Sequence, residues 1–419
     1  MSLSIALSNT FRSLRHPNYC LFFGGQSFSL IGTWIQRIAL PWLVYDVTNS
    51  VLLLGVVGFV GQIPTFLLAP YAGVIADRWN KYRILLITQV LSMLQACLLA
   101  VLVLTGTIDV WSILLLSAFL GCINAFDTPA RQSFLIEMVE DKEDLGNAIA
   151  LNSSMFNGAR LVGPSIAGVL IAAAGEGVCF LINAVSYLFV LGSLLLIKVT
   201  PKERISERKS VVKEFKEGLS YTFGFMPIKH IILLLTLVGL MGMPYTVLMP
   251  VISKEVLRGN AHTFGFLMGA AGLGALCSAL LLASKKTIHG FERYIPVSAA
   301  AFGASLILFS FSRSFLLSIV LMAVIGFCQV YLTASSNTLL QTISEDNKRG
   351  RVMSFYTMAF MGTAPFGSLI SGGLAKAVGA PNTFLIGGVC CILGAAFFAG
   401  RLSKITEAIY GHKECNRGL

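Results

Sequence analysis

Three charged side chains interrupt long apolar stretches of this sequence: Arg37, Asp127 and Arg160. Stretches of this length and hydropathy cross membranes, and a charge inside a membrane is costly enough to indicate a function. A cation there can bind an anionic solute, and a carboxylate can carry a proton or neutralise a cation. These residue types therefore indicate solute recognition and ion coupling.

Asp127 has two candidate partners. Asp127 and Arg160 lie about equally far from the expected loop near residue 143, so they should reach similar depths in a helical hairpin and form an ion pair. Arg131 competes with Arg160, because a spacing of four residues places it one helical turn from Asp127. If the pairing is intermittent, Asp127 is also the candidate proton carrier.

Arg37 is the candidate for solute recognition. It lies roughly 19 residues, or about 28 Å of helix, from the inner end of its stretch, and the segments expected to complete the cavity offer no buried carboxylate. We expect it to meet an anionic or hydroxyl-rich solute; the alternative is that its side chain reaches the outer lipid headgroups. Further contacts with the solute are expected from aromatic and polar side chains, namely Trp34, Gln329, Tyr331, Asn337 and Phe360.

The composition places the chain in a membrane. Hydrophobic residues make up 55% of it and charged residues 12%, and the mean hydropathy is +0.78, so a soluble domain of 419 residues could not bury the apolar surface. Runs of about 20 apolar residues, enough to cross roughly 30 Å of hydrocarbon as helix, recur in two sets of six. We predict an all-α membrane protein with twelve spans near 19–45, 51–76, 82–105, 111–136, 147–174, 178–198, 230–252, 262–283, 292–311, 315–342, 351–378 and 382–402.

The distribution of lysine and arginine predicts the orientation. With both termini in the cytoplasm, about 25 of the 31 basic residues lie on the cytoplasmic side, as the positive-inside rule requires. The net charge of +11 then reflects topology and contact with anionic lipid, and no nucleic-acid partner is expected. Cysteine spacing suggests neither a metal site nor a disulfide, and no cofactor is expected.

The two sets of spans form a repeat. Glycines in and around the fifth span recur around the eleventh at a constant offset of 204 residues, pairing Gly146, Gly158, Gly163, Gly168 and Gly175 with Gly350, Gly362, Gly367, Gly372 and Gly379. We predict a six-helix bundle over 1–198 and a second over 230–419. The basic stretch 199–229 is predicted to be a cytoplasmic linker with an amphipathic helix, because apolar residues recur at helical spacing at Val212, Phe215, Leu219 and Phe223.

The loop between the second and third spans reads Gly-Val-Ile-Ala-Asp-Arg-Trp-Asn-Lys-Tyr-Arg over 73–83. It resembles the Gly-x-x-x-Asp-Arg-x-Gly-Arg-Lys loop of the major facilitator superfamily, with Asn80 in place of the second glycine. Asn tolerates a left-handed backbone better than most residues, so the turn should persist. The resemblance implies that Asp77 holds an inner gate shut by meeting the start of the eleventh span at Gly350–Arg351. It assigns the gate to Gly73, Asp77, Arg78, Lys81, Arg83 and Arg351.

The fifth span resembles the Gly-Pro motif of drug:proton antiporters in that superfamily, through Gly158, Arg160, Gly163, Pro164 and Gly168. Pro164 removes an amide donor, and the glycines permit close packing of helices. The resemblance favours export over import. A second signature of those antiporters is absent, because Ser117 stands where their arginine of the fourth span would fall.

Three stretches narrow the resemblance: 31–45, 124–132 and 350–367. They are similar to the bacterial third drug:proton antiporter family, which includes the enterobactin exporter and macrolide and tetracycline efflux proteins. The resemblance implies a monomeric exporter of a siderophore-like anion or an amphiphilic drug in the bacterial inner membrane, working by alternating access and coupled to protons. The alternatives are an importer or lysolipid flippase of the same fold, or a non-transporting membrane receptor. Nucleotide-binding and nucleophile motifs are absent from the sequence, which argues against an ATP-driven pump or an enzyme.

Overall fold

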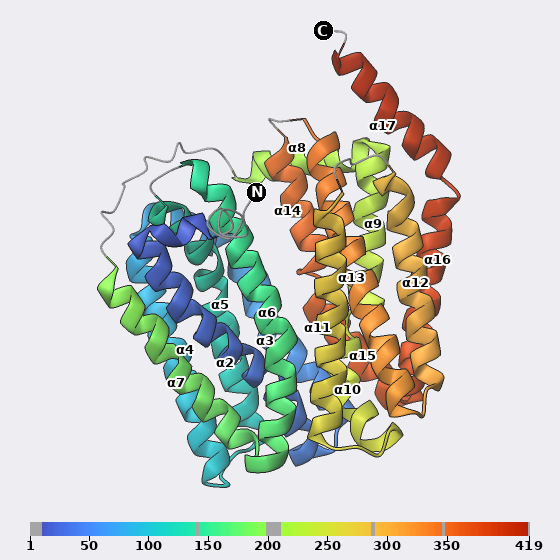
Figure 1. The fold of residues 1–419 in the computed structure, drawn as a ribbon. Coiled ribbons are helices and arrows are strands. Elements are labelled where there is room, and N and C mark those ends of the chain that lie inside the picture. Colours follow the sequence, from blue (N-terminus) through green and yellow to red (C-terminus); the bar gives the residue numbers. More distant parts are fainter. Residues whose placement is uncertain (1–10, 140–141, 198–210, 286–289, 346–347, 418–419) are drawn as a thin grey trace, which may run out of the picture. The chain divides into compact units, whose positions relative to one another are not determined.

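The computed structural model describes residues 11–139, 142–197, 211–285, 290–345 and 348–417, nearly all of them in helices (Figure 1). Two short elements are a 3-10 helix, η1 (Arg12–Arg15), and a π-helix, η2 (Ile252–Val256). The α-helices are α2 (Pro17–Thr48), α3 (Val51–Arg78), α4 (Lys81–Leu104), α5 (Val110–Met138), α6 (Lys142–Ala174), α7 (Glu176–Leu196), α8 (Val211–Gly224), α9 (Met226–Met241), α10 (Tyr245–Val251), α11 (Ala261–Ala283), α12 (Phe291–Phe311), α13 (Phe315–Ile343), α14 (Arg349–Phe360), α15 (Ala364–Val378), α16 (Ala380–Ala399) and α17 (Leu402–Arg417).

Within these residues, ten spans are long and apolar enough to cross a membrane. The other two expected spans are helical as well, but for different reasons they fall short of that standard. Helix α2 has sufficient length but carries polar residues such as Gln26, Gln36 and Arg37 along its course. The eleventh span is divided into α14 and α15, neither of which reaches membrane-spanning length. The predicted all-helical membrane fold is confirmed.

The chain forms two compact units. Unit 1 comprises Met1–Asn49, Val60–Glu207 and Asn260–Gly269, and unit 2 comprises Ser50–Phe59, Arg208–Gly259 and Ala270–Leu419. The first part of α3 therefore belongs to unit 2, and the first part of α11 belongs to unit 1.

Each unit has its own packing. In unit 1, α2 packs against α6 and α7, and α4 packs against α5 and α7. In unit 2, α12 packs against α13 and α16, and α9 packs against α14, α15 and α16. In unit 1 the core holds fully buried aromatic side chains such as Tyr19, Phe22 and Phe134.

Two pairs of the repeated glycines occupy matching environments. Gly175 and Gly379 each precede a helix with φ of 82° and 87°, a left-handed region that favours glycine. A Cβ on Gly168 would lie 2.9 Å from the Gly265 Cα in unit 1, and one on Gly372 would lie 2.8 Å from the Gly55 Cα in unit 2. The 204-residue sequence repeat therefore corresponds to a repeat of backbone conformation and of close helix crossings.

The two copies of the repeat differ because helices in unit 2 are interrupted. Helix α6 runs without interruption through Pro164, whereas its counterpart breaks between α14 and α15 at Met361–Thr363. A second break separates α9 from α10 at Gly242–Pro244. The breaks are neighbours, because a Cβ on Gly239 would lie 2.3 Å from the Thr363 hydroxyl and one on Gly367 would lie 2.7 Å from the Pro244 ring.

Gly372→Ala should lower the thermal unfolding temperature of the purified protein by a few degrees. The added methyl would meet the Gly55 backbone, which cannot yield as a flexible side chain would, and such overpacking typically destabilises by about 1–3 kcal/mol. The matched control is Gly373→Ala, because a Cβ there meets no atom within 4 Å. Equal unfolding temperatures for the two variants would contradict the tight crossing of α3 and α15.

Candidate functional site

Unit 1 gathers three arginines from three helices: Arg37 of α2, Arg131 of α5 and Arg160 of α6, hereafter the arginine cluster. Arg37 interacts electrostatically with both Arg160 and Arg131. Such a concentration of positive charge within spanning helices is unfavourable unless an anion or an acidic side chain compensates it.

Asp127 supplies one compensating charge. Its side chain is buried in α5 and forms an ion pair with Arg131, the partner one helical turn away. Its Oδ1 also accepts hydrogen bonds from Thr88 Oγ1 at 3.0 Å and from Gln89 Nε2 at 2.7 Å, both of α4. Of the two partners expected for Asp127, the structure shows the ion pair with Arg131. The sequence contained no signal for the contributions of Thr88 and Gln89, which depend on how α4 packs against α5.

Trp34 forms an aromatic wall beside the cluster. The Arg37 guanidinium lies 5.0 Å from the centroid of the Trp34 ring, within cation–π range. The Trp34 ring also meets Phe156 of α6 edge to face at 5.8 Å. Gly163 makes this approach possible, because a Cβ there would lie 2.5 Å from the Trp34 Cβ. Gly163, a glycine of the Gly-Pro motif in the fifth span, thus positions Trp34, whereas a Cβ on Gly158 would meet no atom within 4 Å.

A buried chain of amides, which was not predicted from the sequence, fixes the helices that carry the cluster. Asn183 Nδ2 of α7 donates to Gln36 Oε1 of α2 at 2.7 Å, and Gln36 Nε2 donates to Gln95 Oε1 of α4 at 3.0 Å. Gln95 continues to the Leu116 carbonyl of α5 at 3.3 Å. Because Gln36 adjoins Arg37, this network holds the backbone of the recognition candidate in place. The sequence feature that could have indicated this network is the presence of polar residues inside apolar spans.

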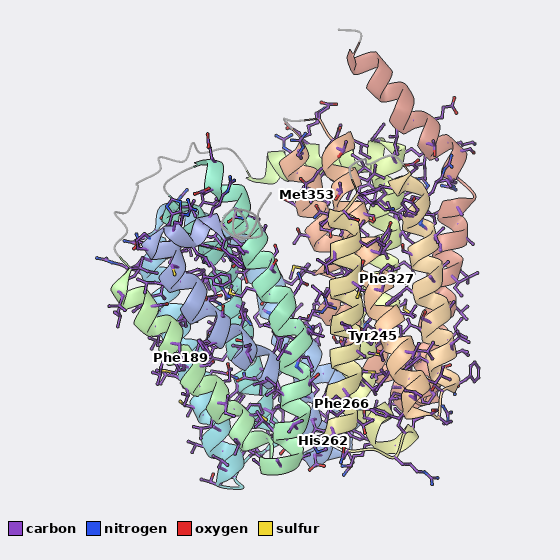
Figure 2. All side chains as sticks on the ribbon, viewed as in Figure 1. Phe189, Tyr245, His262, Phe266, Phe327 and Met353 are labelled. Carbon is purple, nitrogen blue, oxygen red and sulfur yellow. The ribbon has the colours of Figure 1, made fainter. Side chains whose placement is uncertain are left out.

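Unit 2 holds the polar candidates of α13. Gln329 accepts a hydrogen bond from the Tyr245 hydroxyl at 3.2 Å and donates to the Met243 sulfur at 2.9 Å. Both partners lie at the break between α9 and α10, and Tyr245 is labelled in Figure 2. Interrupted helices of transporters place polar groups at substrate sites, so Gln329 remains a candidate substrate contact.

The remaining candidates in unit 2 have other partners. Tyr331 accepts a hydrogen bond from Lys285 Nζ at 2.6 Å. Asn337 accepts one from Gln341 Nε2 at 2.5 Å and also bonds the side chain of Tyr356. Phe360 stacks on Tyr356 with ring centroids 6.5 Å apart. The structure therefore brings Trp34, Arg37 and Arg160 to one site in unit 1, whereas the α13 and α14 candidates belong to unit 2.

The candidate gating loop has local partners. Lys81 Nζ forms an ion pair with Glu137 Oε1 of α5 at 2.5 Å. Asn80 adopts an extended backbone with φ of −65° and caps α4, its Oδ1 accepting from the Arg83 amide at 3.3 Å. The expectation of a left-handed Asn80 is thus wrong, because a helix cap replaces the glycine turn. Arg78 is exposed and Gly73 is uncrowded, whereas the Asp77 side chain lies outside the described residues.

Arg351 pairs within unit 2 with helix α8. Its Nη1 lies 2.9 Å from Glu217 Oε2, and the nearby Tyr221 hydroxyl accepts from the Glu345 amide at 3.3 Å. Lys348 Nζ lies over the Tyr221 ring at 4.4 Å. Among the side chains of α8 that the structure describes, Glu217 and Tyr221 fasten the helix to the α13–α14 turn.

Glu217→Gln should speed amide hydrogen exchange across α8 by about two- to fivefold, since an exposed ion pair contributes about 0.2–1 kcal/mol. Exchange in α16 should not change. Glu407→Gln, an exposed acid of α17, serves as the matched control. Unchanged exchange in α8 would show that the Glu217–Arg351 ion pair does not hold the helix.

The fold and the site define a class: a multi-pass membrane protein whose spanning helices carry buried charged and polar residues, as secondary transporters do. Residues 8–412 match the family model described as transmembrane secretion effector. The chain belongs to this family of the major facilitator superfamily, and it is a transporter rather than an enzyme. The family resemblance seen in the sequence is confirmed.

Several transport proteins are similar in sequence to this chain over most of its length. The chain is 30% identical over 404 residues to the staphyloferrin A transporter of Staphylococcus aureus, covering 95% of this chain and 99% of that protein. It is 25% identical to the multidrug efflux pump Tap of Mycolicibacterium fortuitum, covering 84% and 88%, and 22% identical to macrolide efflux protein A of Streptococcus pyogenes, covering 88% and 92%.

Solved structures support the fold alone. A bacterial homologue of the human lysosomal transporter Spinster, in an inward-facing and unoccupied conformation, aligns with a TM-score of 0.70 at 13% identity, covering 94% of this chain and 98% of that one. The nucleoside transporter NupG aligns with a TM-score of 0.69 at 13% identity, covering 91% and 98%.

Proposed function

We propose that this protein exports a small anionic organic solute across the bacterial inner membrane by alternating access. The observation that supports this proposal most strongly is the arginine cluster. Arg37, Arg131 and Arg160 interact electrostatically, and Asp127 contributes a single negative charge beside them. These four side chains hold three guanidinium groups and one carboxylate, so the site favours an anionic solute over an organic cation.

The surroundings of Arg37 support a solute that is also amphiphilic. Its guanidinium can form paired hydrogen bonds with a carboxylate, while Trp34 and the exposed Phe156 offer rings to the apolar part. The family description, transmembrane secretion effector, and the names of the relatives, a siderophore transporter and efflux pumps, are consistent with export of such a solute. A siderophore-like anion is therefore our first candidate, and an amphiphilic drug is the second.

The proposed energy source is proton influx, with Asp127 as the proton carrier. Because Asp127 is paired with Arg131 and bonded to Thr88 and Gln89, protonation requires Arg131 to leave it. Export driven by proton influx requires the proton and the solute to bind in alternation, so we propose that the solute is carried while Asp127 is ionised and that protonation of Asp127 follows its release. We further propose a monomer with both termini in the cytoplasm and its basic loops against anionic lipid.

The proposal is tested by expressing the protein in a bacterium that lacks its own exporters, beside an empty-vector control. Mass spectrometry of the medium follows siderophores, other organic anions and a panel of cationic and neutral drugs. We expect protein-dependent appearance of an anion in the medium. Accumulation inside the cell would favour the importer, altered lysolipid distribution would favour the flippase, and binding without any flux would favour the receptor.

A further inference from the structure

Lys285 lies in a corner of aromatic rings in unit 2. Its ammonium is 3.7 Å from the centroid of the Tyr294 ring, 5.4 Å from that of Tyr331 and 5.9 Å from that of Phe291. These three rings, hereafter the aromatic box, come from the start of α12 and from α13. All three distances are within the range of cation–π attraction.

Contacts among the aromatic rings hold the box in its arrangement. The Tyr294 and Tyr331 rings stand at 88° with centroids 5.8 Å apart, and Phe291 meets Tyr294 at 64° and 6.4 Å. Phe327 of α13, labelled in Figure 2, stacks behind Tyr331 at 5.7 Å and fixes that wall. Lys285 Nζ also donates to the Tyr331 hydroxyl at 2.6 Å. Perpendicular rings around one ammonium are the arrangement that recognises alkylammonium ligands.

The Lys285 ammonium reaches the box through the lysine side chain, while the Lys285 backbone amide donates to the Leu282 carbonyl at 3.1 Å. Lys285 follows the end of α11, in the connection to α12, while the rings belong to packed helices. Phe291 and Tyr331 are buried, whereas Tyr294 is 39% exposed and forms the open wall. The hydrogen bond with Tyr331 raises the pKa of Lys285, which keeps the amine charged. A different side-chain rotamer of Lys285 would therefore vacate the box while the three rings stay in place.

We infer that the aromatic box is an alkylammonium-binding site and that Lys285 is a specificity-determining residue that fills it from within the chain. By occupying the corner, Lys285 excludes organic cations from it. This inference concerns unit 2 and goes beyond the proposed anion export, since it holds whichever solute the arginine cluster of unit 1 binds.

The test is equilibrium binding of radiolabelled tetramethylammonium to the purified full-length protein in a maltoside detergent, which carries no ammonium group. Lys285→Ala and Lys285→Ser open the box, Lys285→Arg keeps it filled, and Lys376→Ala removes an exposed lysine of α15 as the matched control. We expect the two opened variants to bind the probe about tenfold more tightly than wild type. Lys285→Arg and Lys376→Ala should bind like wild type, and adding Tyr294→Leu to Lys285→Ala should remove the gain.

The ammonium could come from free solute or from a lipid headgroup. Repeating the measurement on Lys285→Ala in nanodiscs separates the two. A gain that persists in phosphatidylglycerol and in phosphatidylethanolamine assigns the box to free cations. A gain present only in phosphatidylglycerol assigns it to the ethanolamine headgroup, and both results support the site. The inference is overturned if folded Lys285→Ala and Lys285→Ser show no gain, or if the gain survives Tyr294→Leu.

Discussion

Arg131→Met should destabilise the protein by about 3 kcal/mol and lower its thermal unfolding temperature by several degrees. Asp127 is only 3% exposed, so removing Arg131 leaves a buried carboxylate without its cation. The effect lies at the lower end of the roughly 3–5 kcal/mol range for broken buried pairs. Two reasons account for this: Arg131 is itself 29% exposed, and Thr88 and Gln89 still donate to Asp127.

A second substitution separates charge from packing. In Asp127→Asn with Arg131→Met, the amide oxygen still accepts from Thr88 and Gln89 but no charge is buried, so most of the lost stability should return. The measurement is thermal unfolding of both purified variants in one detergent. Unfolding of Arg131→Met at the wild-type temperature would show that the pair contributes nothing, and a double variant as unstable as the single one would show that packing of the arginine dominates.

Arg37→Ala should weaken binding of the exported anion about 10- to 100-fold. A hydrogen bond to a charged partner contributes about 1.5–3 kcal/mol, and each ~1.4 kcal/mol is a factor of ten in the dissociation constant. Arg37→Lys should recover only part of this affinity, because an ammonium keeps the charge but loses the planar fork that pairs with a carboxylate and stacks on Trp34.

The measurement is calorimetric binding of the anion identified in the efflux experiment. Lys404→Ala, which removes an exposed positive charge from α17, is the control for net charge and should bind like wild type. If Arg37→Ala binds the anion as tightly as wild type, then Arg37 has a structural role, such as reaching the outer headgroups, and the arginine cluster is not the recognition site.

The membrane fold could be predicted because lipid imposes a simple requirement. Each span must satisfy its own backbone hydrogen bonds and remain apolar for about 20 residues, so hydropathy alone locates it. The glycine repeat could also be found in the sequence, and at Gly175 and Gly379 its reason is local, because both residues have a positive φ that favours glycine. The spans and the positive-φ glycines depend on local backbone geometry, and local backbone geometry can be predicted from residue type.

Features that depend on packing between helices could not be predicted. The sequence left Asp127 with two partners. The structure shows the pair with Arg131 within α5, and the added hydrogen bonds from Thr88 and Gln89 follow from how α4 lies against α5. The break between α14 and α15 carries no proline at its centre, so hydropathy indicated one continuous span there. Tyr331 was predicted to contact solute, and its contact with Lys285 became visible only with the structure. The role of each predicted site residue in transport remains a prediction.

The most direct test of the proposed anion export uses inside-out membrane vesicles, in which an exporter moves solute inward. Vesicles with wild-type protein, Arg37→Ala or Lys404→Ala are given the anion and, separately, a cationic drug, with and without a proton gradient. The proposal predicts that wild type and Lys404→Ala accumulate the anion when the gradient is present, and that Arg37→Ala accumulates far less. Accumulation of the cationic drug instead, at the same rate with Arg37→Ala, would contradict it.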